Sequence, residues 1–225
     1  MSYLLRVVVP DRPGMLGALA TSLGASGADI VSIDVVQRLG GEAVDDIVVE
    51  LPPDRLPDGL ITAARSVDGV SVESLRPFSG TLDTHRELAL VEALAGSGPA
   101  VAQLLAEELP RIFRASWAMI VGCPPSPGGG STVIASSAAA PEIVEDQIEF
   151  FPWCPMATPT LLDSEADEVP TIFSALGTEM MGAPMGEACQ VVLVGRAGGP
   201  AFLRSELLRL AHLVGIAATV AAIDA

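Results

Sequence analysis

The sequence predicts an α+β protein of two domains, and two observations carry this prediction. Over the first 78 residues, β-branched runs alternate with segments whose apolar residues recur at helical spacing, in the order β-α-β-β-α-β. After Phe78-Ser79-Gly80 the pattern changes to longer helical stretches and to strands separated by segments rich in proline and glycine. We therefore expect one domain at residues 1–78 and another at 82–225.

The first strand and helix are predicted at the start of the chain. Residues 4–9 form a β-branched run that ends at Pro10, and a cluster of turn-forming residues follows at 11–14. Apolar side chains then recur at helical spacing from Leu16 to Leu23, where glycine and serine supply a stop. This pattern predicts a helix of about three turns.

A glycine turn joins the next two strands, which are predicted at residues 30–38 and 42–51. In the second of them Ile47, Val49 and Leu51 alternate with residues 46, 48 and 50, which predicts one buried face. A short helix near residues 60–64 and a strand at 70–75 follow. This order places both helices on one face of a four-stranded antiparallel sheet.

The second domain is expected to mix helices and strands. Helices are predicted at residues 82–94, 99–113 and 202–223, with strands at 117–123, 131–137, 178–183 and 189–195. Pro110 should kink or end the second helix, and the closing helix should be long and mostly buried. Residues 124–130 form a loop, a helix is an option near 141–151, and the chain then becomes irregular through Pro170.

The amino-acid composition excludes several classes of function. The chain contains no lysine or asparagine, and its net charge of -16 repels phosphates, so we expect no nucleic-acid partner. Without lysine, neither a P-loop nor a Schiff-base enzyme can be built. The three cysteines lack C-x-x-C spacing and predict no disulfide framework and no zinc ribbon, which favours a reducing cytoplasm.

Targeting signals and ligands for metals are not expected either. The first six residues lack the features of a signal peptide, and the apolar run 213–223 is shorter than the roughly 20 residues of a membrane span. Acidic residues gather between Arg114 and Arg196, but without the closely spaced ligands of a calcium loop, so they predict a solvated surface. We expect a soluble cytoplasmic protein with no metal, cofactor or membrane partner.

The turn at residues 10–16 is the most specific feature of the sequence. Gly14 permits close backbone approach, and the amides of Gly14, Met15 and Leu16 lie at the positive end of the predicted helix, where an anion binds. Asp11 is placed to cap the helix or to receive an ammonium group. The two charges together suit an amino acid zwitterion. The alternative is that Asp11 and Gly14 form only the turn and the cap.

This region resembles an ACT domain, a small regulatory module with a ferredoxin-like βαββαβ fold that commonly binds amino acids where two domains pair side by side. The resemblance rests on the D-R-P-G-M-L turn, on Gly27-Ala28-Asp29-Ile30 before the second strand, and on the order of elements. It implies a homodimer. One wall of the implied pocket is formed by Asp11, Arg12, Gly14, Met15 and Leu16, and the other by Ile30, Val31 and Ser32 of a neighbouring domain. Asp29 stands where the family often has asparagine, and its added negative charge near a carboxylate pocket could either weaken binding or change the ligand.

Residues 82–225 resemble a GAF-type sensor domain. The resemblance rests on the entry helices, the central strands, and the ending at residues 191–202 that leads into a long helix. It implies an antiparallel sheet with flanking helices, in a family whose members often dimerise through helices and sometimes hold small molecules. A stretch without basic residues, 115–189, argues against a phosphate ligand.

Enzyme chemistry has little support in the sequence. Cys154 could act as a nucleophile, but a thiolate needs a basic neighbour, and nothing places His85 or His212 beside it. We expect His212 in the core or at a helix interface, and Cys123 and Cys189 as small buried hydrophobic residues. The prediction is a non-enzymatic regulatory protein that binds a small amino acid or related metabolite at a dimer interface. The alternative is a ligand-free assembly or interaction module for a separate enzyme or regulator.

Overall fold

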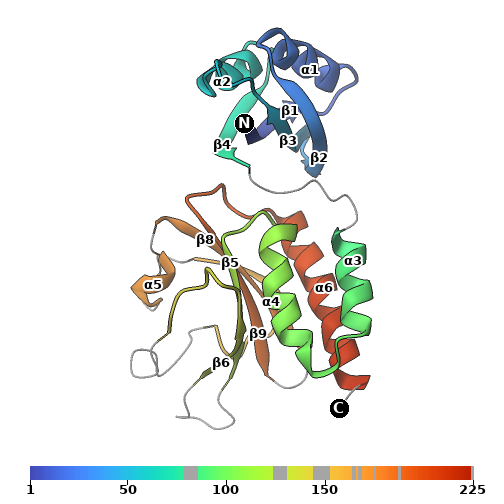
Figure 1. Ribbon diagram of the computed structural model, residues 1–225, viewed down its shortest axis with the longest axis vertical. Coiled ribbons are helices and arrows are strands. Elements are labelled where there is room, and N and C mark those ends of the chain that lie inside the picture. Colours follow the sequence, from blue (N-terminus) through green and yellow to red (C-terminus); the bar gives the residue numbers. More distant parts are fainter. Residues whose placement is uncertain are drawn as a thin grey trace. The chain divides into compact units, whose positions relative to one another are not determined.

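The structure, a computed structural model, divides the chain into two compact units, Met1–Leu82 (unit 1) and Asp83–Ala225 (unit 2) (Figure 1). It describes residues 1–78, 86–123, 131–143, 153–163, 166, 169–174, 176–186 and 189–223. Each unit has an antiparallel sheet with helices packed on it, so the predicted α+β class is confirmed.

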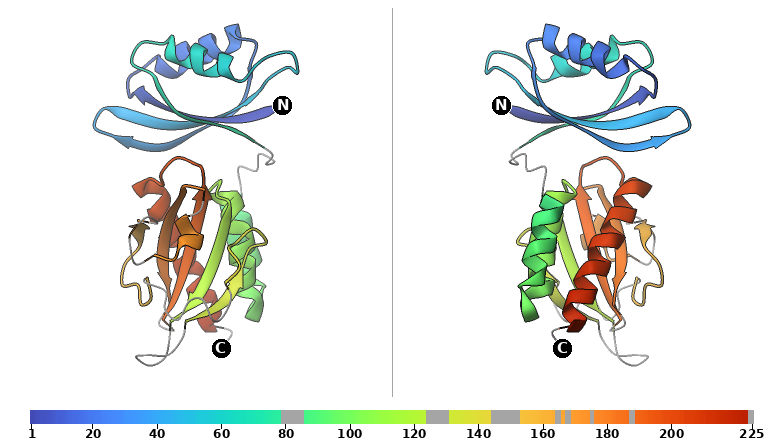
Figure 2. Two further views of the ribbon diagram at one scale, coloured as in Figure 1. Left: turned by 90° about the vertical axis from the view of Figure 1, so that its left-hand side faces the viewer. Right: turned by 90° about the vertical axis from the view of Figure 1, so that its right-hand side faces the viewer.

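Unit 1 has the order of elements that the sequence predicts. Its elements are β1 (Ser2–Pro10), α1 (Met15–Ala25), β2 (Asp29–Leu39), β3 (Glu42–Glu50), α2 (Asp58–Arg65) and β4 (Ser71–Pro77). The strands are antiparallel in the order β2-β3-β1-β4, and both helices cover one face of the sheet (Figure 2). This is the ferredoxin-like arrangement, with β2 and β4 as its edge strands.

The core of unit 1 lies between the sheet and its two helices. Leu5 and Val7 of β1 pack there with Leu19 of α1 and Leu60 of α2. Burial of this face follows from the alternation of side chains along each strand. The predicted burial of Ile47, Val49 and Leu51 is confirmed, but Asp46 and Val48 on the opposite face of β3 are buried as well. Strand β3 pairs with a strand on both sides, so its opposite face is less open than that of an edge strand.

Unit 2 has a five-stranded antiparallel sheet in the order β6-β5-β9-β8-β7. Its elements are α3 (Arg86–Ala95), the 3-10 turn η1 (Gly98–Ala100), α4 (Val101–Ile112), β5 (Trp117–Gly122), β6 (Thr132–Ser136), β7 (Thr160–Leu162), α5 (Thr171–Ser174), β8 (Thr178–Met185), β9 (Gln190–Ala197) and α6 (Arg204–Ile223). Helices α3, α4 and α6 cover one face and α5 the other (Figure 2). Ala118 and Ile120 of β5 face the first group of helices, and Trp117 and Met119 face the second side.

Three details of unit 2 differ from the sequence-based expectations. Strand β7 lies in the stretch expected to be irregular, where its three residues are too few to show a period among the prolines. Helix α4 continues two residues past Pro110 to Ile112, because a proline so near the end removes little of the helix. Residues 141–143 are not helical. The rest of the optional helix, 144–151, and the loop 124–130 lie outside the described residues.

Helix α6 is buried along one side only. Leu210, Val214 and Ala217 enter the core, whereas Leu208 and His212 are exposed, so the expectation of a mostly buried helix is wrong, as is a core position for His212. By length and composition alone α6 is the single candidate membrane span among the described residues, a test that core helices of soluble proteins also pass. Its apolar side packs on the sheet of unit 2.

Candidate functional site

The turn between β1 and α1 holds the backbone of the candidate site. Gly14 precedes α1 with a φ of 92°, in the left-handed region that favours glycine. The amide of Asp11 donates to the carbonyl of Gly41 at 2.8 Å, which ties the turn to the β2–β3 hairpin. No side chain caps α1, so the expectation that Asp11 caps this helix is wrong. The carboxylate of Asp11 is therefore left for other partners.

Backbone donors are open at the start of α1. Within the described part of the chain, no group accepts a hydrogen bond from the amides of Gly14, Leu16 or Gly17. The amide of Met15 makes a long bond of 3.4 Å to the carbonyl of Arg12. Because the first amides of a helix point outward at its positive end, this turn can hold an anionic group.

A cavity of about 320 Å³ opens beside this turn, in the lower part of the size range of small-molecule sites. The five residues predicted for the first wall all line it: Asp11, Arg12, Gly14, Met15 and Leu16. The sequence did not indicate the contributions of Val35 and Arg38 from β2 and of Ala43 and Asp45 from β3. All of these residues belong to unit 1.

Asp45 is the most unusual residue of the cavity. It lies on the helix-covered face, between Val7 of β1 and Val35 of β2, and is only 1% exposed. Among the described residues, neither of its carboxylate oxygens has a hydrogen-bond partner. Burial raises the pKa of the Asp45 carboxyl above its ordinary value, Arg38 opposes this rise, and Asp11 and then Asp46 add to it.

Sequence reasoning missed Asp45, although a signal was present. Asp45 and Asp46 are consecutive in a strand, so their side chains point to opposite faces of the sheet. One carboxylate must therefore enter the face that the helices cover. Such burial without a partner is costly and points to a role beyond folding.

The remaining charges of the site are near the surface. Arg38 Nε lies 3.8 Å from Asp11 Oδ1, and both side chains are exposed, so this ion pair is weak and can rearrange. Arg12 Nε lies 3.3 Å from the sulfur of Met15. The cavity thus offers two guanidinium groups and open amides to an anion, and two carboxylates to a cation.

The predicted second wall lies elsewhere within one chain. Asp29 pairs with Glu50 at one end of the hairpin, whereas Leu39 pairs with Glu42 at the end beside the turn. Asp29, Ile30, Val31 and Ser32 do not line the cavity of their own chain. They lie on an edge strand, where Val31 is 42% exposed.

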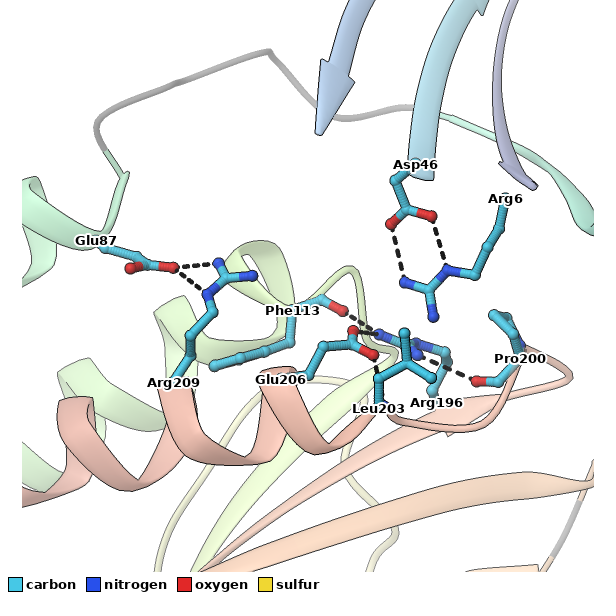
Figure 3. Close-up of polar contacts among 9 residues, drawn as sticks. All are labelled: Arg6, Asp46, Glu87, Phe113, Arg196, Pro200, Leu203, Glu206 and Arg209. Carbon is cyan, nitrogen blue, oxygen red and sulfur yellow. Dashed lines mark hydrogen bonds and ion pairs between the residues drawn. The ribbon is translucent and has the colours of Figure 1, made fainter. Parts of the chain in front are cut away.

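The other buried charges of the described chain are paired (Figure 3). Arg6 donates to both carboxylate oxygens of Asp46, at 2.7 and 2.9 Å, and each residue is 1% exposed. In unit 2, Arg196 donates to Glu206 at 2.6 Å, and Glu206 accepts the amide of Leu203 at 2.9 Å. These pairs hold strands and helix ends together and do not line the cavity.

The residues considered for thiol chemistry lie in unit 2. Cys154 is buried, and burial raises the pKa of its thiol, which lowers the thiolate fraction. Cys123 is half-buried at the end of β5, whereas Cys189 is exposed, so the expectation that Cys189 is a buried hydrophobic residue is wrong. His85 lies outside the described residues. No group of histidine, cysteine and acidic side chains in the described ranges could hold a metal ion.

No protein-family model matches the chain, and no curated protein matches it. Similar solved structures include an ACT domain protein from Streptococcus pneumoniae, at 15% identity over 36% of this chain and 98% of that one, with a TM-score of 0.29. A GAF domain of a phosphoenolpyruvate-protein phosphotransferase from Coxiella burnetii is 11% identical over 63% of this chain and 96% of that one, with a TM-score of 0.45. A GAF domain/HD domain protein from Geobacter sulfurreducens is 16% identical over 60% and 97%, with a TM-score of 0.41.

Proposed function

We propose that unit 1 binds a small amino acid or a related metabolite and that the chain is a non-enzymatic regulatory protein. The carboxylate of the ligand would bind the open amides of Gly14 and Leu16, with Arg12 or Arg38 beside it. The ammonium group would bind Asp45. The observation that carries the proposal is the buried, unpartnered carboxylate of Asp45 in the cavity next to the start of α1.

The energetics of Asp45 support an ammonium ligand. A buried carboxylate without a partner destabilises the folded chain, because it loses its hydration without gaining a hydrogen bond. An ammonium group in the cavity would supply both the opposite charge and the donors. The ligand would then stabilise the folded protein in proportion to its occupancy.

The edge strand β2 supports a composite pocket formed by two chains. Antiparallel pairing of two β2 strands reverses one of them, so residues 29–32 of one chain would lie near Val35 and Arg38 of the other. The exposed apolar side chains of β2, among them Val31 and Ile33, would be covered by this pairing. Asp29, Ile30, Val31 and Ser32 would thereby reach the cavity from a second copy, as the resemblance implies.

Regulation would arise because ligand binding and dimer formation favour each other. A ligand that contacts both chains binds the dimer more tightly than the monomer, and this difference shifts the equilibrium towards the dimer. Unit 2, with its GAF-like topology, would pass this change to a partner. We place this activity in the cytoplasm, on the basis of cysteine usage.

A melting-temperature panel with the twenty amino acids tests this proposal on the full chain. At least one amino acid should raise the melting temperature and, in sedimentation velocity, the dimer fraction. Asp45→Asn should reduce both responses, whereas Asp58→Asn, a change of the same type on the exposed start of α2, should leave them unaltered. No response from any amino acid would overturn the proposal.

A second candidate function is assembly without a ligand, and the exposed edge of β2 favours it. The two functions respond differently to substitution. Ile33→Lys places a charge on the edge strand and should disrupt pairing in both cases. Asp45→Asn or Gly14→Val should weaken the ligand response under the first function and leave assembly intact under the second.

A further inference from the structure

The three cysteines of unit 2 come together from distant parts of the sequence. Cys123 directly follows β5 and Cys189 directly precedes β9, and the amide of Cys123 donates to the carbonyl of Cys189 at 2.8 Å. Cys123 packs against the buried cluster that contains Cys154, and the thiols of Cys189 and Cys154 both influence the pKa of the Cys123 thiol. Cys123 is thus the central member of a group of three thiols.

Exposure changes steadily across this thiol group. Cys189 is exposed, Cys123 is half-buried, and Cys154 is buried with Trp117 and Phe173 in the core cluster on that face of the sheet. Cys189 has a φ of 51°, a conformation uncommon for a residue with a side chain. The outermost thiol, Cys189, is therefore the most open to a reagent in solution.

The register of the β5–β9 ladder predicts that Cys123 and Cys189 lie within the spacing of a disulfide. Gly122 pairs with Gln190 in the β5–β9 ladder, so Cys123 and Cys189 occupy the next opposite positions. Directly opposite residues of antiparallel strands have Cα atoms about 4.5–5.5 Å apart, which falls inside the usual disulfide range of about 4.4–6.8 Å. Metal binding is not favoured, because no metal-holding group is found among the described residues.

We propose that Cys189, Cys123 and Cys154 form a thiol–disulfide exchange relay that takes up small disulfides from solution. Cys189 reacts with the small disulfide, and Cys123 then transfers the disulfide bond from the exposed thiol to the buried one. The relay would attach the segment that carries Cys154 to the end of β5.

The electrons and protons of the relay balance. The Cys189 thiolate attacks one sulfur of the small disulfide and releases one small thiol, which leaves a mixed disulfide on Cys189. The Cys123 thiolate attacks the Cys189 sulfur, and the second small thiol leaves with the other proton. Two protein thiols are oxidised and one small disulfide is reduced to two thiols. Attack by Cys154 on the Cys123 sulfur then moves the bond inward and frees Cys189.

The rate of the first step should depend on pH. The hydrogen bond with Cys123 raises the pKa of Cys189, and burial raises the pKa of Cys123 and Cys154. Each thiol therefore has less thiolate at neutral pH than an ordinary cysteine. Below these pKa values the rate of disulfide formation should rise about tenfold per pH unit.

The relay can be tested on the reduced full chain with oxidised glutathione at pH 8.5, followed by alkylation and mass spectrometry. Trypsin leaves all three cysteines in one peptide, because no basic residue lies between Arg114 and Arg196. A glutamyl endopeptidase separates them, since it can cut after Glu142 and Glu179. We expect a Cys123–Cys189 disulfide first and a Cys123–Cys154 disulfide later, with one of the three thiols free.

Three single variants distinguish the relay from other thiol chemistry. Cys154→Ser should stop at the Cys123–Cys189 disulfide, and Cys189→Ser should slow oxidation at least tenfold. Cys123→Ser, with Cys123→Ala as a second version in case one fails to fold, should accumulate glutathione on Cys189 without an internal disulfide. The proposal is overturned if the native chain forms only disulfides between chains, or if Cys123→Ser still links Cys154 to Cys189 at the native rate.

Discussion

The carboxylates of Asp45 and Asp46 are neighbours in the sequence but have different surroundings on the two faces of the unit 1 sheet. Asp46 accepts two hydrogen bonds from Arg6 on one face, and both residues are buried. Asp45, the residue before it, is buried on the face with the helices and has no hydrogen-bond partner among the described residues. A paired buried carboxylate belongs to the fold, whereas an unpaired one beside a cavity is available to a ligand.

Loss of the paired carboxylate should have the largest effect on stability. Asp46→Asn removes the negative charge to which the buried Arg6 guanidinium donates two hydrogen bonds and should lower the free energy of unfolding by about 3–5 kcal/mol. Urea unfolding followed by circular dichroism measures this change. The double variant Arg6→Leu/Asp46→Leu is the control and should recover most of the loss, because neither charge of the pair remains buried. If Asp46→Asn is as stable as the native chain, the contrast between the two faces is wrong.

Loss of the unpaired carboxylate should affect binding and leave stability intact. Asp45→Asn removes a buried charge without a partner, so the unliganded variant should be at least as stable as the native chain at pH 7. Its affinity for the amino acid should fall by about 10- to 100-fold, since a hydrogen bond to a charged group contributes about 1.5–3 kcal/mol. Urea unfolding and calorimetric titration measure the two quantities. A variant that is clearly less stable would show that Asp45 is structural.

Unit 2 also contains a buried ion pair, formed by Arg196 and Glu206. Glu206→Gln keeps the shape of the side chain but removes its charge opposite Arg196, which retains hydrogen bonds to the carbonyls of Phe113 and Pro200. We expect the free energy of unfolding of unit 2 to fall by about 1–2 kcal/mol. Differential scanning calorimetry can follow it, with ligand binding in unit 1 as the control that should not change.

The smallest expected difference between the two faces is in the pH dependence of ligand binding. Because burial raises the pKa of Asp45, lowering the pH protonates it above the range of ordinary carboxylates. Ligand affinity should therefore weaken as the pH falls through this pKa, by at most about tenfold per pH unit. The stability of the unliganded chain should change in the opposite direction, because protonation of Asp45 favours the folded state. In Asp45→Asn, the contribution of this carboxyl to the pH dependence of ligand affinity and of stability should be absent.

The sequence predicts the elements of unit 1 well because their periods change sharply at turn residues. The turn at 11–14 separates a β-branched run from helical spacing, and Gly40-Gly41 separates two strands of opposite direction. Strand β7 escapes such reasoning because Thr160–Leu162 is too short to show alternation. The half-exposed α6 was predicted as mostly buried because apolar residues surround much of its circumference.

One part of the candidate site could likewise be predicted from the sequence, and the other part could not. The local turn from Asp11 to Leu16 could be predicted, because its residues are adjacent in the sequence and its chemistry follows from the start of a helix. Asp45 and Arg38 could not be placed there without the register of β2 and β3, which brings distant residues beside the turn. The cysteine group of unit 2 depends in the same way on the β5–β9 pairing.

Calorimetric titration of the most stabilising amino acid into the native chain, Asp45→Asn and Asp46→Asn shows whether the Asp45 carboxylate holds the ammonium group of the ligand. We expect normal affinity for the native chain and for folded Asp46→Asn, and an affinity about 10- to 100-fold weaker for Asp45→Asn. Equal affinity for the native chain and Asp45→Asn would contradict the claim that this carboxylate holds the ammonium group of the ligand.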